Sequence, residues 1–474
     1  MNKNASPIPK ALTGGAMVLA MTSAVFAQEK PYTQPGHAQP PALPAAPKPA
    51  TATAVDAKPA PTPEPNAFEK FFNAKIPDAI AKGKFNLNSR LRFEYADQDD
   101  VAAITEPSYA PTIRTRFGFT TAPLYGFQAM LEGENVTALG SEENYNAAGS
   151  NGTAYKPVVA DPPTTELNQA WLAYSYTNWV TAKYGRQRIT LDNHRFIGDV
   201  GWRQNMQTYD SVSVESKPIK DLSLYYGYVW DVHRVFGNVP DLPAANRDFK
   251  SRSHIFNASY APCDYGRFVA YSYLLDLQNA AGAAQSCATY GGYFAGNAKI
   301  AEKASLGYRA EAALQTDYAD SPQEYQAEYY SFELSGTLDR YSVGGGYEVL
   351  GTDSNDNAAG SVGFRTPLAT LHAFNGWADV FLTTPTKGLR DLYGFAQVNL
   401  PLQIPLRAIY HKYDADSGGG DFGQEINVQA SRKFGKYWTT LVKYAYYDGK
   451  DPFGAVATTR FDLHKFWAQV EFNF

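Results

Sequence analysis

The chain has 474 residues, of which 14% are aromatic and 19% charged, and 33 of them are tyrosines. Its mean hydropathy of −0.38 and its lack of long apolar runs exclude a helical membrane protein, because each helical span needs about 20 apolar residues. The formal net charge of −5 argues against nucleic acid as a partner.

The N-terminus has the features of a secretory signal peptide. Two lysines precede an apolar stretch over residues 11–24, which is too short to span a bilayer, and residues 25–27 form a cleavage site. We therefore expect residues 1–27 to be removed. Residues 28–65 are rich in Pro and Ala and cannot pack a core, so we predict a periplasmic linker that is either a spacer or a contact to the cell wall.

Residues 66–84 are predicted to form a short N-terminal helix. Asn66 can cap it, and Glu69 follows three residues later, which is the pattern of a capping box. Three phenylalanines then follow at helical spacing. We expect this helix either on the membrane surface or in the periplasmic mouth of the next domain.

From residue 85 onward, apolar and polar residues alternate with period two, the pattern of strands with two different faces. Eighteen strands are expected, near residues 85–95, 112–122, 126–136, 166–177, 179–188, 207–216, 222–232, 252–261, 266–275, 286–296, 303–315, 325–336, 341–350, 389–400, 404–414, 423–434, 438–448 and 464–474. The last strand is apolar on one face, polar on the other, and ends in Phe474. A terminal strand of this kind is typical of bacterial outer-membrane barrels.

The connections between these strands alternate in length. The connection over 122–125 is short, for example, whereas those over 137–165 and 351–388 are long. Outer-membrane barrels have tight periplasmic turns and long outer loops, whereas a soluble all-β protein has no reason to keep this alternation. We therefore predict an all-β fold, a transmembrane antiparallel up-and-down β-barrel over residues 85–474. Both termini are expected in the periplasm of a bacterial outer membrane, with lipid around the barrel.

The two cysteines are predicted to be free. Cys263 falls in a short turn, and Cys287 begins a strand at the opposite rim of the barrel. The apolar band between the rims is about 25 Å tall, whereas the Cα atoms of a disulfide lie within about 7 Å.

The face opposite the apolar one should line the lumen, and it carries both signs of charge. An arginine at the lipid midplane would cost about 2–4 kcal/mol, which favours the inward assignment. This face either attracts an anionic solute with a basic ladder or braces the wall with Arg–Glu pairs. The candidate pore-lining residues are Arg90, Arg92, Glu94, Arg114, Arg116, Glu132, Glu134, Arg309, Glu311 and Arg407.

The long connection over residues 351–388 contains apolar residues at helical spacing, from Leu368 to Phe381. A long loop with its own amphipathic helix is usually functional. We predict that this helix either constricts the channel, with His372, Trp377 and Asp379 as candidate residues, or packs on its neighbours.

Three groups of residues resemble the alginate-export family of outer-membrane barrels. The first runs from Leu368 to Asp379 (LATLHAFNGWAD) and continues through FLTTP and GLRDLY to Tyr393. The second comprises YGRQR over 184–188, DNHRFIG over 192–198 and WRQN over 202–205. The third comprises Gly83-Lys84-Phe85 and Arg90-Leu91-Arg92-Phe93-Glu94. The resemblance implies an eighteen-stranded channel that passes a uronic-acid polysaccharide through an arginine-lined lumen. The mixed inward charges of this chain depart from that last point.

The leading functional hypothesis is therefore passive passage of a hydrophilic, anionic solute such as an alginate-like polysaccharide. A general small-solute porin is the alternative. A hydrolase is the third hypothesis, resting on His194 beside Asn193 and Asp192, with no serine evidently paired to them. No histidines have metal-ligand spacing and no Gly-rich loop could cradle a phosphate, so we expect no metal, cofactor or nucleotide.

Overall fold

A computed structural model describes the chain over residues 66–239, 242, 247–353, 362–450 and 460–474. The predicted signal peptide over 1–27 and the predicted linker over 28–65 lie outside the described residues.

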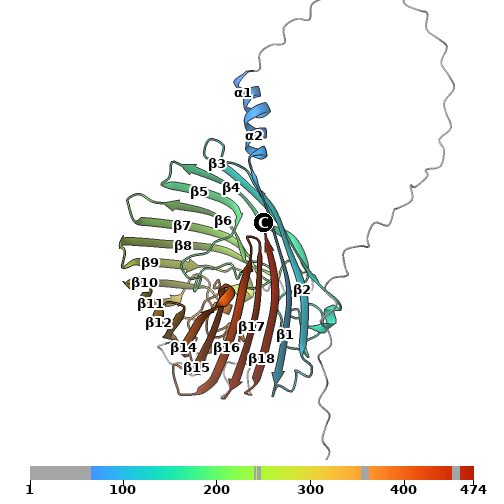
Figure 1. Ribbon diagram of the computed structural model, residues 1–474, viewed down its shortest axis with the longest axis vertical. Coiled ribbons are helices and arrows are strands. Elements are labelled where there is room, and N and C mark those ends of the chain that lie inside the picture. Colours follow the sequence, from blue (N-terminus) through green and yellow to red (C-terminus); the bar gives the residue numbers. More distant parts are fainter. Residues whose placement is uncertain (1–65, 240–241, 243–246, 354–361, 451–459) are drawn as a thin grey trace, which may run out of the picture. The chain divides into compact units, whose positions relative to one another are not determined.

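The described residues form eighteen strands (Figure 1). Their bounds are β1 Lys84–Asp99, β2 Ser108–Thr120, β3 Phe127–Ala138, β4 Thr164–Tyr176, β5 Val180–Gln187, β6 Thr208–Ser216, β7 Leu222–His233, β8 Asp248–Cys263, β9 Gly266–Leu275, β10 Cys287–Ala301, β11 Ala304–Asp317, β12 Gln326–Leu338, β13 Tyr341–Leu350, β14 Leu389–Leu400, β15 Ile404–Asp414, β16 Asp421–Phe434, β17 Trp438–Gly449 and β18 Asp462–Asn473. Each strand pairs with its neighbours in sequence, and β1 also pairs antiparallel with β18. The predicted closed antiparallel barrel is therefore confirmed.

The two faces of each strand differ as the period-two pattern predicts. In β1, Leu91 and Phe93 are 46% and 36% exposed on the outer face, whereas Arg92 and Glu94 on the other face are buried. Outward apolar residues match a hydrocarbon solvent, and inward polar residues match water or other polar groups. Side-chain parity alone thus separates lipid-facing from lumen-facing residues.

The segment before the barrel is helical. It comprises α1 (Ala67–Lys70), the π-helical turn η1 (Phe71–Lys75) and α2 (Ile76–Ala81). Both hydrogen bonds of the capping box are present, from the Asn66 N–H to Glu69 and from the Glu69 N–H to Asn66. The N–H of Ala122 donates to the carbonyl of Ala79 at 2.9 Å, which ties the helix to the β2–β3 turn. Among the described residues, no helix has the length and apolar character to cross a membrane.

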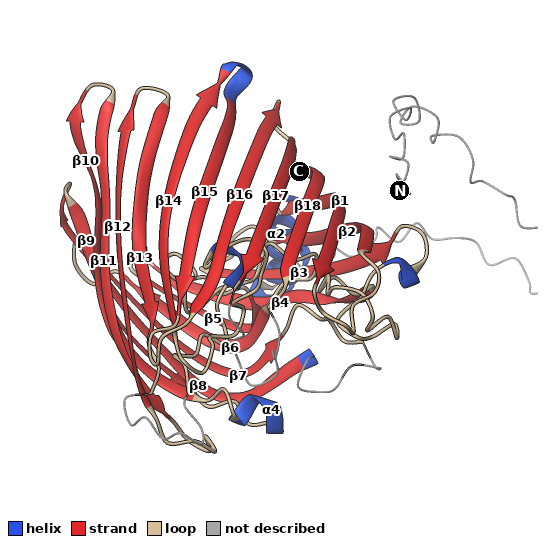
Figure 2. Ribbon diagram, turned by 90° about the horizontal axis from the view of Figure 1, so that it is seen from below, coloured by secondary structure: helices blue, strands red, loops and turns tan. Residues whose placement is uncertain are grey.

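Two long connections fold into the barrel, the β5–β6 loop (residues 188–207) and the described part of the β13–β14 loop (residues 351–353 and 362–388) (Figure 2). The β5–β6 loop reaches across the lumen, because Asp192 accepts a hydrogen bond from Tyr293 of β10 at 2.8 Å. Further along this loop, the guanidinium of Arg195 pairs with Glu348 of β13 at 2.8 Å. The two loops also join each other through a parallel bridge between Ile197 and Leu368. They therefore form one internal layer, the loop layer.

The predicted amphipathic helix in the β13–β14 loop is wrong. In the described part of that loop, only a short 3₁₀ turn over Leu371–Ala373 is helical. The backbone N–H groups of Trp377 and Ala378 donate instead to the side chains of Asn427 and Glu425 on β16, at 3.3 and 2.9 Å. The barrel wall thus supplies the acceptors that a helix would have provided internally, and the helical spacing of apolar residues reflects packing against several strands.

The two cysteines are free, as the topology predicts. Cys263 ends β8 and is exposed, whereas Cys287 begins β10 and is buried. Cys263 therefore lies at the rim of the short turns and Cys287 at the rim of the long loops, so the two thiols are not in contact.

Candidate functional site in the barrel lumen

Four predicted pore-lining arginines lie together on the inner face of β1 and β2, and all four have carboxylate partners. Arg90 and Arg114 both contact Glu471 of β18 at 3.2 Å, and Arg116 pairs with Glu134 of β3. The remaining one, Arg92, lies 3.7 Å from Asp161. We call the inner face of β1–β3, β17 and β18 the charged wall. Its positive and negative charges are largely paired.

The β5–β6 loop covers this wall. The guanidinium of Arg90 donates to the carbonyls of Gly201 and Trp202 at 3.1 Å, and that of Arg116 donates to the carbonyl of Gln204 at 3.2 Å. The arginines nominated from the sequence therefore brace the loop layer against the barrel.

Arg203 of the same loop joins three carboxylates. It donates to Glu94 of β1 at 3.1 Å and to Asp379 of the β13–β14 loop at 2.7 Å, and lies 3.7 Å from Asp161. The Arg203 side chain is buried. A buried cation is tolerated only when it is paired, so Arg203 fastens both loops to the charged wall.

The three predicted constriction residues lie beside Arg203, around Lys443 of β17. The Lys443 ammonium is 3.7 Å from the ring centre of Trp377 and 4.2 Å from that of Trp202. It also donates to Nε2 of His372 at 2.7 Å. Because an ammonium only donates, Nε2 must be unprotonated, and Nδ1 carries the proton that His372 donates to Asp379 at 2.6 Å.

The directions of the pKa shifts of His372 and Asp379 agree with this tautomer. Burial lowers the pKa of His372 well below its usual value, and the charge of Lys443 acts in the same direction. Burial opposes ionisation of Asp379, yet its pKa stays well below the usual value, because it accepts from His372 and faces the cations Lys465 and Arg203. The cluster therefore contains a neutral imidazole and an ionised carboxylate.

The other nominated charges do not join the arginines of β1 and β2. Glu132 accepts hydrogen bonds from the amides of β4, and Arg309 pairs with Glu311 of the same strand at 2.6 Å. Arg407 stacks on the ring of Phe395, 4.4 Å away. These residues are spread over separate strands, and their role in a pore remains a prediction.

Two polar cavities are left open beside the loop layer, both away from the charged wall. One has a volume of about 420 Å³ and lies at the end of the short turns, against the inner face of β5–β9. Its lining includes Lys183, Arg267, Glu215 and Tyr225. We call it the short-turn pocket. Arg267 is exposed and lies over the ring of Tyr293, at 5.6 Å.

The second cavity, of about 410 Å³, lies at the end of the long loops and is called the long-loop pocket. It is lined by Arg234, Arg365, threonines and glutamines, and no carboxylate occurs among its lining residues in the described part of the chain. Arg365 donates to the side-chain oxygen of Gln323 at 2.6 Å and lies over the ring of Tyr325 at 4.5 Å. Its guanidinium thus has neutral partners.

Sequence reasoning missed these pocket residues. Lys183 and Arg267 lie on the inner parity of the predicted strands 179–188 and 266–275, so applying the face assignment to these two strands would have found them. Arg365 lies in a connection without period-two patterning, and no local signal marks it.

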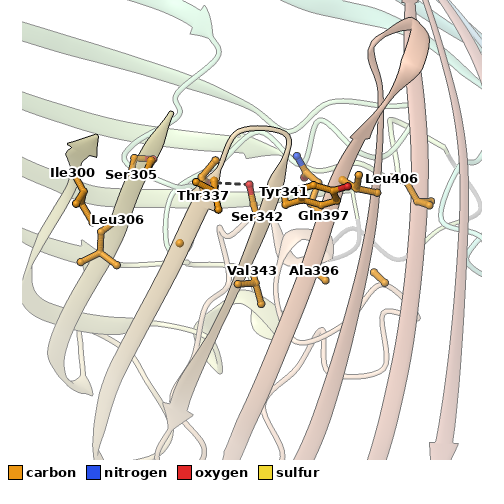
Figure 3. A pocket seen from close by; sticks show the side chains of 15 residues that line it. Ile300, Ser305, Leu306, Thr337, Tyr341, Ser342, Val343, Ala396, Gln397 and Leu406 are labelled. Carbon is orange, nitrogen blue, oxygen red and sulfur yellow. Dashed lines mark hydrogen bonds between the residues drawn. The ribbon is translucent and has the colours of Figure 1, made fainter. Parts of the chain in front are cut away.

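A larger apolar groove, of about 830 Å³, lies over β11–β15 (Figure 3). Leu306, Val343 and Leu406 line it from the outward parity, and Val343 is 65% exposed. This groove faces the lipid side of the barrel, and we do not count it as part of the solute site.

The structure does not assemble a hydrolase centre around His194. Asp192 accepts hydrogen bonds from Tyr293 and Asn257 rather than orienting the imidazole, and the Nδ1 atom of His194 lies 3.9 Å from Asp199. This arrangement holds the β5–β6 loop in place.

One group of possible metal ligands occurs among the described residues. Asp210, Asp231 and His233 offer ligand atoms within 4.8 Å of one another. The two carboxylates are already paired, with Arg186 at 2.8 Å and with Lys250 at 2.5 Å. We assign no metal to this group.

A closed barrel that is apolar outside and polar inside is the architecture of an outer-membrane channel. The profile of the alginate export family matches residues 82–338. The chain belongs to this family, whose members are channels rather than enzymes. A comparison with curated protein sequences finds no match.

Solved structures support the fold. OccAB2 of Acinetobacter baumannii is 12% identical with a TM-score of 0.64, over 84% of this chain and 99% of that one. OccAB3 of the same organism is 14% identical with a TM-score of 0.64, over 83% and 100%. OccD3 (OpdP) of Pseudomonas aeruginosa is 13% identical with a TM-score of 0.59, over 84% and 92%. The chain is therefore similar in fold to these outer-membrane proteins.

Proposed function

We propose that this outer-membrane channel passively conducts hydrophilic anions. The observation that carries the proposal is the contrast between paired and unpaired cations in the lumen. On the charged wall, Arg90, Arg114 and Arg116 each contact a carboxylate, and the first two share Glu471. In the long-loop pocket, Arg365 has neutral partners, and no carboxylate occurs among the described lining residues. The short-turn pocket has three cations, including Arg267, against the carboxylates Glu215 and Asp192, so it too has an excess of positive charge. Cations of this kind raise the local concentration of anions in a low-dielectric passage.

The family favours a carboxylated saccharide as the solute. Its name refers to alginate export, and uronate carboxylates are the planar anions that guanidinium groups bind in bidentate fashion. The pockets also contain hydroxyl and amide groups that suit sugar hydroxyls, such as Tyr225, Thr384 and Gln323. An alginate-like polysaccharide or its oligomers therefore fits both the charge and the hydrogen-bonding capacity of the pockets.

Reversal potentials in planar bilayers test this proposal. With a KCl gradient across the membrane, we expect anion preference, and we expect a uronic-acid oligosaccharide to block the current more strongly than a neutral oligosaccharide of equal length. Equal permeability of K⁺ and Cl⁻, without selective block, would instead favour the general small-solute porin. Strong cation preference would contradict both the proposal and its charge argument.

The orientation and the N-terminal segments complete the proposal. We place both termini in the periplasm, because the connections on the side of the termini are the short ones. Residues 1–27 then act as a secretory signal and residues 28–65 as a periplasmic linker. Protease added to intact cells should leave an epitope at the C-terminus intact and cleave one inserted in a long loop.

A further inference from the structure

The two polar pockets lie on the same side of the lumen. The short-turn pocket rests on β5–β9, and the long-loop pocket is built from the far ends of β7 and β8 and the loops beside them. Arg267 lines the first and Arg234 and Arg365 line the second. A solute that leaves one pocket along this side of the barrel would therefore reach the other.

An apolar part of the loop layer separates the two pockets. Phe196 is 8% exposed, and its ring centre lies 5.4 Å from Tyr271, 5.2 Å from Tyr329 and 5.9 Å from Phe364. Phe364 itself lines the long-loop pocket, and the preceding part of the β5–β6 loop, residues 188–192, lines the short-turn pocket. Phe196 thus belongs to a group of aromatic rings between them, which we call the septum.

The charged wall offers a poorer passage than this septum. Opening it would separate Arg203 from Glu94 and Asp379 and remove the carbonyl partners of Arg90. The separation of Arg203 from Glu94 would break a buried ion pair. Phe196 is held by contacts with neighbouring rings, so displacement of its ring would break no ion pair.

We propose that solute crosses the barrel between the long-loop and short-turn pockets, beside β5–β12, and that Phe196 is the residue that closes this route. The route avoids the arginines of β1 and β2, although they are the densest group of inward cations. This inference rests on the proposed function, because it assigns the path of the same conducted anion.

Single-channel conductance of Phe196→Ala tests the route. We expect an increase of about three-fold or more over the native barrel, since removing the ring joins the two pockets. Phe381→Ala is the matched control. Phe381 is a phenylalanine of the loop layer that is 6% exposed, packs against Tyr413 with the ring centres 4.6 Å apart, and lines neither pocket. Its variant should conduct like the native protein.

A thiol-modification experiment covers the case in which Phe196→Ala fails to assemble. In a barrel with both native cysteines replaced by serine, Ser259→Cys places a thiol in the short-turn pocket. Thr439→Cys places one at the same end of the barrel on β17 of the charged wall, opposite Glu471. A bulky charged thiol reagent should block conductance through the first variant and leave the second largely unaffected.

The outcomes separate the route from the proposed function. Equal conductance of Phe196→Ala and Phe381→Ala, or block of the Thr439→Cys variant rather than of the Ser259→Cys variant, would overturn the route. If anion preference persisted in those experiments, the proposed function would still stand. Loss of anion preference in the native barrel would instead overturn the proposed function.

Discussion

The charged wall and the pocket side of the lumen are built from the same barrel, yet they differ in what their cations contact. Arg90 and Arg116 on the charged wall donate to loop carbonyls and to carboxylates. Arg267 and Arg365 on the pocket side lie beside aromatic rings, amides and open cavity. The density of arginines in the sequence therefore marks where the loops are anchored, whereas the sparser cations are the ones that bind the solute in the proposed function.

This difference has a simple electrostatic cause. A buried ion pair has already exchanged its water for a partner, so its field outside the pair is weak. A cation with neutral partners keeps a net charge that acts over the adjoining cavity, and the low dielectric of the walls strengthens the field of that charge.

Four experiments can break or sharpen the comparison, from the largest expected effect to the smallest.

Removal of Arg203 should have the largest effect, and it should be on stability. Arg203→Met leaves Glu94, Asp161 and Asp379 without their shared cation, and breaking a buried pair costs about 3–5 kcal/mol. Urea unfolding of the barrel in detergent measures the loss. The control is Arg340→Met, because Arg340 lies exposed in a short turn over Tyr341 and should change the unfolding free energy by about 0.5 kcal/mol or less. Equal effects of the two substitutions would show that Arg203 does not anchor the loop layer.

Lowering the pH should weaken the charged wall through His372. Burial depresses the pKa of this imidazole in the docked loop, so an undocked His372 binds a proton that the docked one does not. The contribution of this buried neutral imidazole to the free energy of unfolding is then fully present above a pH of about 6.5 and is lost as the pH drops below it. By pH 5.5 the loss is about 1.4 kcal/mol at most.

Unfolding of His372→Gln measured from pH 8 to 5.5 provides the comparison. The difference between native protein and variant should shrink as the pH falls, because only the native protein carries this titration. A difference that stays constant across that range would show that His372 does not titrate with undocking.

Substitution of Arg365 should change selectivity rather than stability. Arg365→Gln removes a charge from the long-loop pocket and keeps a hydrogen-bonding side chain. We expect the permeability ratio of Cl⁻ to K⁺ to fall about two-fold, which corresponds to a screened interaction of roughly 0.5 kcal/mol. Reversal potentials at low salt measure it. Arg186→Gln is the control, since Arg186 pairs with Asp210 outside both pockets. An unchanged ratio in Arg365→Gln would remove this pocket from the path.

The smallest effect is expected from a neutralised pair on the charged wall. The double variant Arg116→Gln and Glu134→Gln removes one charge of each sign from neighbouring strands. Selectivity should stay at its native value, because paired charges cancel and the loop layer covers them. A clear shift in reversal potential would place these residues on the conducting path, and the distinction between the two sides of the lumen would then fail.

The period-two pattern and the alternation of connection lengths determined most of the fold. Parity alone placed Arg90, Arg92, Arg114 and Arg116 on the inner face, because a strand has only two faces and lipid excludes charge from one. The alternation of short and long connections placed Cys263 and Cys287 at opposite rims of the barrel. Family resemblance and strand count, obtained from different residues, led to the same barrel.

Tertiary structure alone decided what fills the lumen. The apolar spacing from Leu368 to Phe381 fits a helix, but the wall satisfies the backbone of that loop, and only the folded barrel brings Asn427 and Glu425 to it. The hydrogen bond from the guanidinium of Arg90 to the carbonyl of Trp202 likewise joins residues more than a hundred positions apart. Local sequence specifies which face a side chain takes, whereas exposure on that face depends on long-range contacts between loops and strands.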